Sequence, residues 1–354
     1  MYELNEKIRD LVPYEPIAGS YPIRLDANES FLPLPDGLRA KIAETAANIA
    51  YNRYPDPLSA DVTAAFAAYY GISPDLVTAG NGSDELISIL STAFLMKGDA
   101  MMVILPDFSM YQFYASLAEG RVVVCGKRDD LTIDVDAVIA KVKAENVRMI
   151  VFSNPCNPTS LGLPREEVRR LIRSVDALVV LDEAYMDFWN QSLLGEVGEY
   201  DNLVILRTCS KAIGSAALRL GFAVAQPRLT RVLRAVKSPY NVNSLSQAIG
   251  TLVLAEREWE ADARERIVAS RKALQASLEA LAAEFPGAFS LYDSCTNFVF
   301  LKTDRAKELF QGFLDRGIAI RYMGGFLRVT AGSEAENAAF LDAFRALLRE
   351  GETA

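Results

Sequence analysis

Residues 148–182 read RMIVFSNPCNPTSLGLPREEVRRLIRSVDALVVLD, and this stretch decides the fold. Its two ends are short apolar runs, and a charged amphipathic segment separates them. Apolar runs with little alternation fit strands buried on both faces, and a helix between two such strands favours parallel pairing. Similar runs occur at 101–105 (MMVIL), 121–125 (RVVVC) and 202–208 (NLVILRT). From about residue 76 to 225 we therefore expect an α/β domain with a mostly parallel sheet flanked by helices.

A different pattern lies on either side of this central part. Residues 36–50 and 59–70 have helical spacing and many alanines. After residue 243 the sequence contains an amphipathic region, three strand candidates and a terminal helix, at 244–284, 289–293, 297–302, 318–322 and 336–350. We expect a large domain (36–243) and a smaller α+β C-terminal domain (244–354), which an N-terminal segment (1–35) joins.

Composition and charge restrict the possible partners. The 354 residues are 51% hydrophobic, enough for a large core, and the formal net charge is −9. A negative chain has no basic field for phosphate backbones or anionic lipids, so we expect neither nucleic acid nor membrane as a partner. Residues 1–16 carry charges where a signal peptide needs an apolar run, which favours a cytoplasmic protein. The four cysteines stand apart without CxxC spacing, so we expect no metal site and no disulfide framework.

The chain contains no histidine. This excludes a Ser-His-Asp triad, imidazole-ligated zinc and a histidine general base, so proton transfer needs another residue type. Lysine becomes the leading candidate, and Lys211 follows one of the apolar runs directly, in RTCSKAIGS.

Polar residues follow several of the apolar runs, at the sheet edge where open α/β folds bind ligands. Residues 80–85 (GNGSDE) lead into a helix whose free N–H groups would suit a phosphate, although an ordinary N-capped turn explains them equally well. Residues 153–160 (SNPCNPTS) hold Asn154 and Asn157 in a fixed loop, or form a plain proline loop.

Two further junctions supply an acid and a base. Asp182 ends a buried run, with Tyr185 close behind, and a buried carboxylate is costly without a cationic partner. Lys211 follows the next run, with Ser210 and Arg219 nearby, although a lysine there could simply be solvated. Taken together, the junctions deliver a phosphate cradle, an asparagine, an acid, a tyrosine and a lysine to one edge. Pyridoxal phosphate (PLP) needs this set: a lysine, an acid at its ring nitrogen, donors to its phenolate oxygen and a phosphate cup.

The ordered motifs also carry a resemblance. They are LDANES (25–30), GNGSDELI (80–87), PDFSMY (106–111), NPCNPTS (154–160), DEAYMDF (182–188), RTCSKAIGSAALRLGF (207–222), SPYNVNSLSQ (238–247), CTNFVF (295–300) and LRVT (327–330). Together they resemble histidinol-phosphate aminotransferases, which are fold-type-I PLP-dependent transferases. The resemblance covers nearly the whole chain, from residue 25 to the last helix.

The resemblance implies roles around the PLP ring. Lys211 would form the Schiff base and then carry the proton once substrate displaces it. Asp182 would pair with the pyridine nitrogen, and Tyr185 and Asn157 would contact the phenolate oxygen. Phe108, where the family often has tyrosine, would stack on the ring.

The same resemblance implies a phosphate cup and a homodimer. The cup would be formed by Gly82, the backbone amides of Ser83 and Asp84, and the side chains of Ser210 and Arg219. Tyr54 would reach the phosphate from the neighbouring subunit, because the family is dimeric with sites at the interface.

Substrate recognition would use Arg328, with Arg321 and Tyr14 as helpers. A guanidinium fork can accept either the phosphate of histidinol phosphate or a carboxylate of glutamate and 2-oxoglutarate. Alternatives of the same fold are an aromatic amino-acid aminotransferase and an enzyme like threonine-phosphate decarboxylase. A non-catalytic PLP-binding regulator is a further alternative, against which the retained Lys211 argues.

Three features depart from the family pattern. Ser160 stands where a glycine usually follows NPT, and SKAIGSAALR replaces a commoner glycine-containing form. The segment from Arg321 to Arg328 is short, which bears on the substrate more than on the cofactor.

Overall fold

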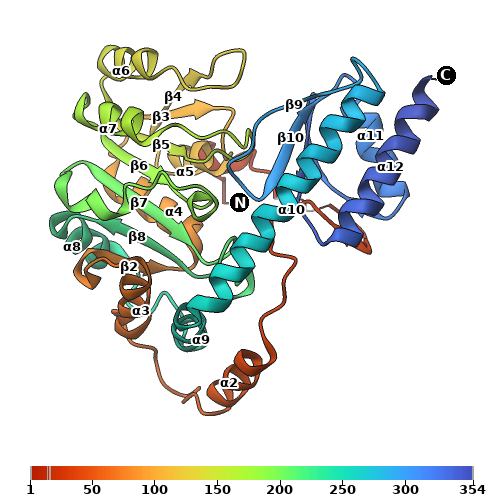
Figure 1. The fold of residues 1–354 in the computed structure, drawn as a ribbon. Helices are drawn as coiled ribbons and strands as arrows, with labels where there is room; N and C mark the ends of the chain where they lie inside the picture. The colour runs from red at the N-terminus through yellow and green to blue at the C-terminus, as the bar shows by residue number, and fades with distance from the viewer. Residues whose placement is uncertain (1, 14, 16, 353–354) are drawn as a thin grey trace.

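The computed structural model describes residues 2–13, 15 and 17–352. Its large domain is built on a seven-stranded sheet (Figure 1). In spatial order the strands are β2 (Val77–Gly80), β8 (Gly221–Ala225), β7 (Leu203–Thr208), β6 (Leu178–Asp182), β5 (Val147–Ser153), β3 (Ala100–Leu105) and β4 (Arg121–Gly126). Strand β8 runs antiparallel to both of its neighbours, and all other pairs are parallel. The mostly parallel sheet expected from the apolar runs is confirmed.

Helices cover both faces of this sheet. One apolar cluster contains residues of α3 (Ala60–Tyr70), α6 (Val135–Ala144), α7 (Arg165–Arg173) and α9 (Ser244–Ala255). The other contains residues of α4 (Gly82–Phe94), α5 (Met110–Leu117) and α8 (Pro227–Val236). Every residue of β7 and β8 is buried, which explains why these runs show no alternation of polar and apolar residues.

The C-terminal part forms a second core. Its antiparallel sheet has the order β12 (Arg321–Met323), β13 (Phe326–Thr330), β10 (Phe298–Lys302) and β9 (Ser290–Leu291). Three helices accompany it, α10 (Arg257–Glu284), α11 (Ala306–Asp315) and α12 (Glu334–Glu352), and they share an apolar cluster with the sheet. Figure 1 shows the long helix α10 running from the large domain to this smaller one.

The N-terminal segment contributes to both parts. It contains α1 (Glu6–Arg9) and β1 (Ile23–Arg24), and β1 pairs in parallel with β11 (Ile318–Ala319). Helix α2 (Asp36–Ala47) follows, and α9 packs against both α2 and α3. The division of the chain at residues 36 and 244 therefore stays a proposal.

Two predicted elements are divided in the structure. The amphipathic region 244–284 is broken at Glu256, whose ψ of 57° lies outside the helical range, so it forms α9 and α10. The strand candidate 318–322 changes partner along its length, because Ile318 pairs with β1 and Arg321 pairs with β13. Short 3-10 turns complete the fold at η1 (Pro74–Leu76), η2 (Met186–Phe188), η3 (Leu194–Glu199) and η4 (Ala216–Leu218).

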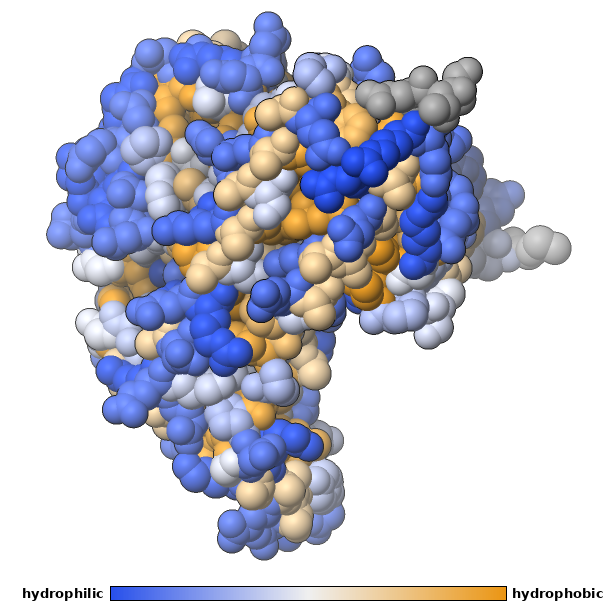
Figure 2. Space-filling view, turned by 45° about the vertical axis from the view of Figure 1, so that its right-hand side comes forward, coloured by the Kyte–Doolittle hydropathy of each residue, from blue (hydrophilic) through white to orange (hydrophobic). Residues whose placement is uncertain are grey.

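The surface follows the ordinary distribution of polar and apolar residues. On the face shown in Figure 2, hydrophilic residues cover most of the outer rim, and hydrophobic residues show mainly toward the middle. Among the described residues, no helix combines the length and the apolar composition that crossing a bilayer requires.

Candidate active site

The candidate site lies where the carboxyl ends of β6 and β7 meet the beginning of α4. Asp182 is the last residue of β6, and Lys211 follows the end of β7 by three residues. Gly82 begins α4, which follows β2. The sheet thus gathers three of the polar junctions at one edge, as the sequence predicts.

Asp182 is a buried carboxylate that is bound by neutral donors. The Tyr111 hydroxyl of α5 donates to Oδ2 at 2.8 Å, and the Ala184 amide donates to Oδ1 at 3.0 Å. Among the described residues, no cation lies within ion-pair distance of it. Burial raises the pKa of Asp182 from 3.8 to about 6, while the hydrogen bonds from Tyr111 and Ala184 act in the opposite direction.

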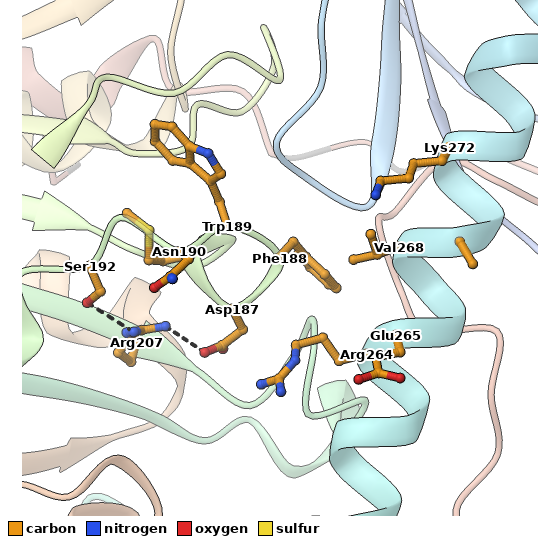
Figure 3. A pocket seen from close by; sticks show the side chains of 12 residues that line it. Asp187, Phe188, Trp189, Asn190, Ser192, Arg207, Arg264, Glu265, Val268 and Lys272 are labelled. Carbon is orange, nitrogen blue, oxygen red and sulfur yellow. Dashed lines mark hydrogen bonds and ion pairs between the residues drawn. The ribbon is translucent and has the colours of Figure 1, made fainter.

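Glu183, the next residue, lies in a separate ion cluster. Arg207 of β7 reaches Glu183 at 3.1 Å and Asp187 at 2.8 Å, and all three side chains are almost fully buried. Figure 3 shows Arg207 bonded to Asp187 and Ser192 beside a cavity of about 650 Å³ between η2 and α10. None of the residues that line this cavity belongs to the set predicted from sequence.

Lys211 lies across the edge from Asp182. Its Nζ donates to the Ala27 carbonyl at 2.8 Å and lies 5.9 Å from the centre of the Tyr185 ring. Burial lowers the pKa of Lys211 to about 8, and the positive charge of Arg328 acts in the same direction. A lysine with this pKa loses its proton near neutral pH more readily than a solvated one, which suits a proton carrier.

The predicted phosphate cup is compact. Gly82 has a φ of 76°, and a Cβ there would come within 2.9 Å of Arg219 Nη2. Gly221 of β8 is equally constrained, because a Cβ would come within 2.4 Å of the Ser83 amide nitrogen. Arg219 Nη1 also donates to Ser210 Oγ at 3.5 Å. The guanidinium, the hydroxyl and the N-terminus of α4 therefore lie together, an arrangement that favours an anion.

The Asp84 side chain makes a contact of its own, and the predicted role of its backbone amide stays a prediction. One of its side-chain oxygens accepts a hydrogen bond from the Tyr114 hydroxyl at 2.9 Å, and the other is buried without a hydrogen-bond partner. Burial and the hydrogen bond to Asp84 raise the pKa of Tyr114. Tyr114 is therefore held as a neutral donor beside the first turn of α4.

Arg328 and Asn157 meet although 171 residues separate them. Arg328 Nη1 donates to Asn157 Oδ1, and its Nη2 donates to the Asp26 carbonyl at 2.6 Å. The guanidinium carbon lies 5.4 Å from the centre of the Phe298 ring. The predicted anion-binding arginine is thus buried at the same edge as the predicted phenolate contact.

Residues 26–28, which we call the strap, contact three of the predicted site residues in succession. The Asp26 carbonyl accepts from Arg328, and the Ala27 carbonyl accepts from Lys211. Asn28 Nδ2 donates to the Tyr185 hydroxyl at 2.8 Å. Burial raises the pKa of Tyr185, while the charge of Arg328 and the hydrogen bond from Asn28 lower it.

Four predicted residues remain, of which two adjoin residues of this centre, one is exposed and one lies outside the description. Phe108 packs edge-on against Tyr111, with ring centres 5.6 Å apart. Tyr54 is 81% exposed and stacks on Tyr240. Arg321 faces Arg328 in the register of β12 and β13. Tyr14 lies outside the described residues.

The backbone conformation at Ser160 explains why the family usually has glycine at this position. Its φ is 61°, in the left-handed region where a side chain is strained and glycine is not. The Ser160 hydroxyl donates to the Asp293 carbonyl at 2.7 Å, which offsets part of that strain. The departure is therefore accommodated locally.

Sequence reasoning assigned no role to Tyr111 or to the strap, although both lie within the quoted motifs PDFSMY and LDANES. It also missed Asp107, which accepts hydrogen bonds from Ser153 and so fixes the start of the asparagine loop. Hydrogen-bonding side chains inside these motifs were the available signal. Within the described part of the chain, no group of three or more acidic or cysteine side chains could hold a metal ion.

The chain is similar to known proteins along most of its length. A family model described as "Aminotransferase class I and II" matches residues 21–344. A curated histidinol-phosphate aminotransferase of Clostridium kluyveri is 38% identical over 98% of each chain, and one of Clostridium novyi is 37% identical over 94% of each. The crystal structure of histidinol-phosphate aminotransferase from Sinorhizobium meliloti in complex with pyridoxal-5'-phosphate has a TM-score of 0.87, at 23% identity, and covers 99% of this chain and 98% of its own.

Proposed function

The chain belongs to the class I and II aminotransferases and to their histidinol-phosphate aminotransferase family, and from this we propose that it transfers an amino group between histidinol phosphate and 2-oxoglutarate, with PLP as cofactor. Such a reaction belongs to histidine biosynthesis. The observation that carries the proposal is that Asp182 and Lys211 lie at the same sheet edge. Asp182 is a buried carboxylate without a cationic partner among the described residues, and burial lowers the pKa of Lys211.

The residues present fit PLP at each of its polar ends. Asp182 offers a buried negative charge to a protonated ring nitrogen, which would take the place of the missing cation. Gly82, Ser210 and Arg219 lie close together beside the N-terminus of α4, and this set of donors suits the phosphate. PLP, when bound, acts as an electron sink for the bonds at the substrate's α-carbon.

The chain's own residues would divide the remaining work. Lys211 would hold the cofactor covalently and would move the proton at the substrate's α-carbon, for which its lowered pKa is suited. Tyr185 and Asn157 would bind the phenolate oxygen. Asp182 would pair with the ring nitrogen and favour its protonated form.

Arg328 would orient the substrates. Its guanidinium is buried and already directed by Asn157 and Asp26, so little conformational freedom is lost when it binds an anion. The same fork can take a phosphate or a carboxylate, as two half-reactions with different substrates require. Arg321, its cross-strand neighbour, and Tyr14 remain proposed helpers.

We also propose a cytoplasmic homodimer. Tyr54 stacks on Tyr240, and further exposed aromatic and aliphatic side chains close to these two in sequence are Tyr51, Leu58 and Val236. Tyr54 would cross this surface to the partner's phosphate cup, so the site would be complete only in the dimer. An exposed apolar patch of this kind is typical of an interface.

The proposal is tested by the visible absorbance of purified, PLP-loaded protein and by its change on adding substrates. We expect a visible band that Lys211→Ala abolishes, with amino-group transfer lost by about 10³-fold or more. Lys272→Ala, an exposed lysine outside the site, is the matched control and should keep both properties.

Substrate choice is read separately in single-turnover reactions. Histidinol phosphate and glutamate should each convert the cofactor to its amino form, whereas phenylalanine and threonine phosphate should not. Conversion by phenylalanine without histidinol phosphate would favour an aromatic aminotransferase, and release of carbon dioxide from threonine phosphate would favour a decarboxylase.

A further inference from the structure

The strap residue Asn28 lies at the centre of a buried hydrogen-bond chain between the two domains. Its Nδ2 donates to the Tyr185 hydroxyl at 2.8 Å, and its Oδ1 accepts from the Thr330 hydroxyl at 3.0 Å. Its backbone amide donates to that same hydroxyl at 3.0 Å, and its carbonyl accepts from Asn297 Nδ2 at 3.1 Å. Asn28 has a φ of 55°, a conformation that asparagine tolerates better than most residues.

The backbone amide of Asn28 fixes which groups donate and which accept along this series of hydrogen bonds. An N–H group can only donate, so the Thr330 oxygen accepts from Asn28, and its own proton is left to donate. That proton goes to Asn28 Oδ1, which turns the amide NH₂ toward Tyr185. The Tyr185 oxygen then accepts, so its own proton must point to a different acceptor.

We propose that Asn28 is a positioning residue that sets the direction of the Tyr185 hydroxyl proton. By donating to the Tyr185 oxygen, it makes Tyr185 a donor toward the cofactor side of the site. The inference deepens the proposed function and rests on it only in placing the cofactor beside Tyr185. Thr330 fixes the orientation of the Asn28 amide and acts one step further away.

The same chain links Tyr185 to the anion end of the site. Thr330 and Arg328 lie two residues apart on β13, where they pair with Phe298 and Phe300 of β10. Asn28 and Asp26 lie two residues apart on the strap, where one contacts Tyr185 and the other contacts Arg328. A shift of the small domain would therefore move two groups together, the Arg328 guanidinium and the Asn28 amide that donates to Tyr185.

The sign of a pKa change tests the direction. The full-length protein is labelled with 3-fluorotyrosine, whose phenol is more acidic than that of tyrosine, and the Tyr185 resonance is assigned with Tyr185→Phe. Asn28→Gly removes the amide without strain, because glycine accepts the positive φ. Loss of a donor should move the Tyr185 titration to higher pH, by about one unit for one buried hydrogen bond.

The opposite arrangement predicts the opposite sign. If Tyr185 donates to Asn28, removing an acceptor lowers the pKa of Tyr185, and this result would overturn the proposal, as would an unchanged titration. Thr330→Val removes the hydroxyl that orients the Asn28 amide. It should shift the Tyr185 pKa in the same direction as Asn28→Gly, but by less. It also serves if Asn28→Gly fails to fold. Asn337→Ala, another buried asparagine that bonds Gly332 and Ser270, is the matched control and should leave Tyr185 unchanged.

A second measurement follows the PLP-loaded enzyme. Asn28→Gly should weaken PLP binding in equilibrium dialysis by about tenfold and lower kcat by a similar factor, with KM for glutamate within about twofold because Arg328 keeps its partners. A rise in KM with unchanged kcat would contradict the proposal. The fluorine titration uses no substrate, so a failure of histidinol phosphate to react leaves this test intact.

Discussion

Asp182 and Glu183 are adjacent buried carboxylates with opposite surroundings. Glu183 faces Arg207 at 3.1 Å, and it also accepts hydrogen bonds from Ser192 and the Leu193 amide. Among the described residues, the Asp182 carboxylate accepts hydrogen bonds from the Tyr111 hydroxyl and the Ala184 amide. Burial raises the pKa of both, but only Glu183 has a guanidinium that counteracts the effect.

The difference separates an acid that is paired within the chain from the acid that we propose pairs with the cofactor. A buried charge needs compensation, and Glu183 receives it from within the chain. In the part of the chain that the structure describes, Asp182 has neutral donors and no cation within ion-pair distance, and under the proposed function the cofactor would supply the positive charge. A buried carboxylate at a strand end is thus a candidate for a ligand-binding site when its surroundings contain donors but no cation.

The largest expected effect distinguishes the two acids by activity. Asp182→Asn should lower kcat by about 10³-fold, because the ring nitrogen loses its negative partner, and the fold should remain. Glu183→Gln keeps the shape of its side chain and should change kcat by less than about threefold. Steady-state kinetics of both variants check this. Equal losses of kcat would remove the distinction.

For stability we expect the opposite order, with the Arg207 ion cluster around Glu183 mattering more than Asp182. Arg207→Met leaves Glu183 and Asp187 buried without their cation and should reduce the free energy of unfolding by about 3 kcal/mol. Urea denaturation measures it, with Glu183→Gln/Arg207→Met as the partial rescue. If Arg207→Met unfolds at the wild-type urea concentration, the cluster is not structural.

The smallest effect concerns how Tyr111 holds Asp182. The folded pKa of Asp182 is about 6, above its ordinary 3.8, so the cofactor-free protein gains stability from this group below about pH 4. That contribution is lost as pH rises through about 6. Tyr111→Phe removes a hydrogen bond that lowers the pKa of Asp182, so the pKa should rise further and the loss of stability should continue to higher pH. The additional loss in the free energy of unfolding should be about 1 kcal/mol.

Unfolding free energies between pH 4 and pH 8 measure this effect, with Asp182→Asn as the reference that lacks the titrating group. A Tyr111→Phe profile that coincides with the wild type, after subtraction of that reference, would show that the hydroxyl does not influence Asp182.

The large domain could be predicted well from sequence because its signals are local. Strands β5 and β6 are buried throughout or nearly so, and their apolar runs need no knowledge of the rest of the chain. The small domain was harder, since residues 318–322 look like one strand, and only tertiary pairing with β1 and β13 divides them. Pairing over such distances has no local signature.

The site followed the same rule. Residues placed by a strand end, such as Asp182 and Lys211, could be assigned to the edge from sequence. The contact between Asn157 and Arg328 was not predicted: the resemblance gave each residue a separate role, and no local pattern links two residues that lie 171 positions apart. The strap was missed for a physical reason: two of its three contacts use backbone carbonyls, which carry no residue-type signal.

The strap also bears on how the protein is made. Asn28 is synthesised well before Thr330, which orients it and lies 302 residues later. Most of the seven-stranded sheet closes over shorter separations, so it can form while the chain is still growing. The Tyr185 hydroxyl would gain its final orientation only after β13 leaves the ribosome. A nascent chain would then hold a folded scaffold with an unfinished pocket, and tight cofactor binding would wait for the synthesis of β13.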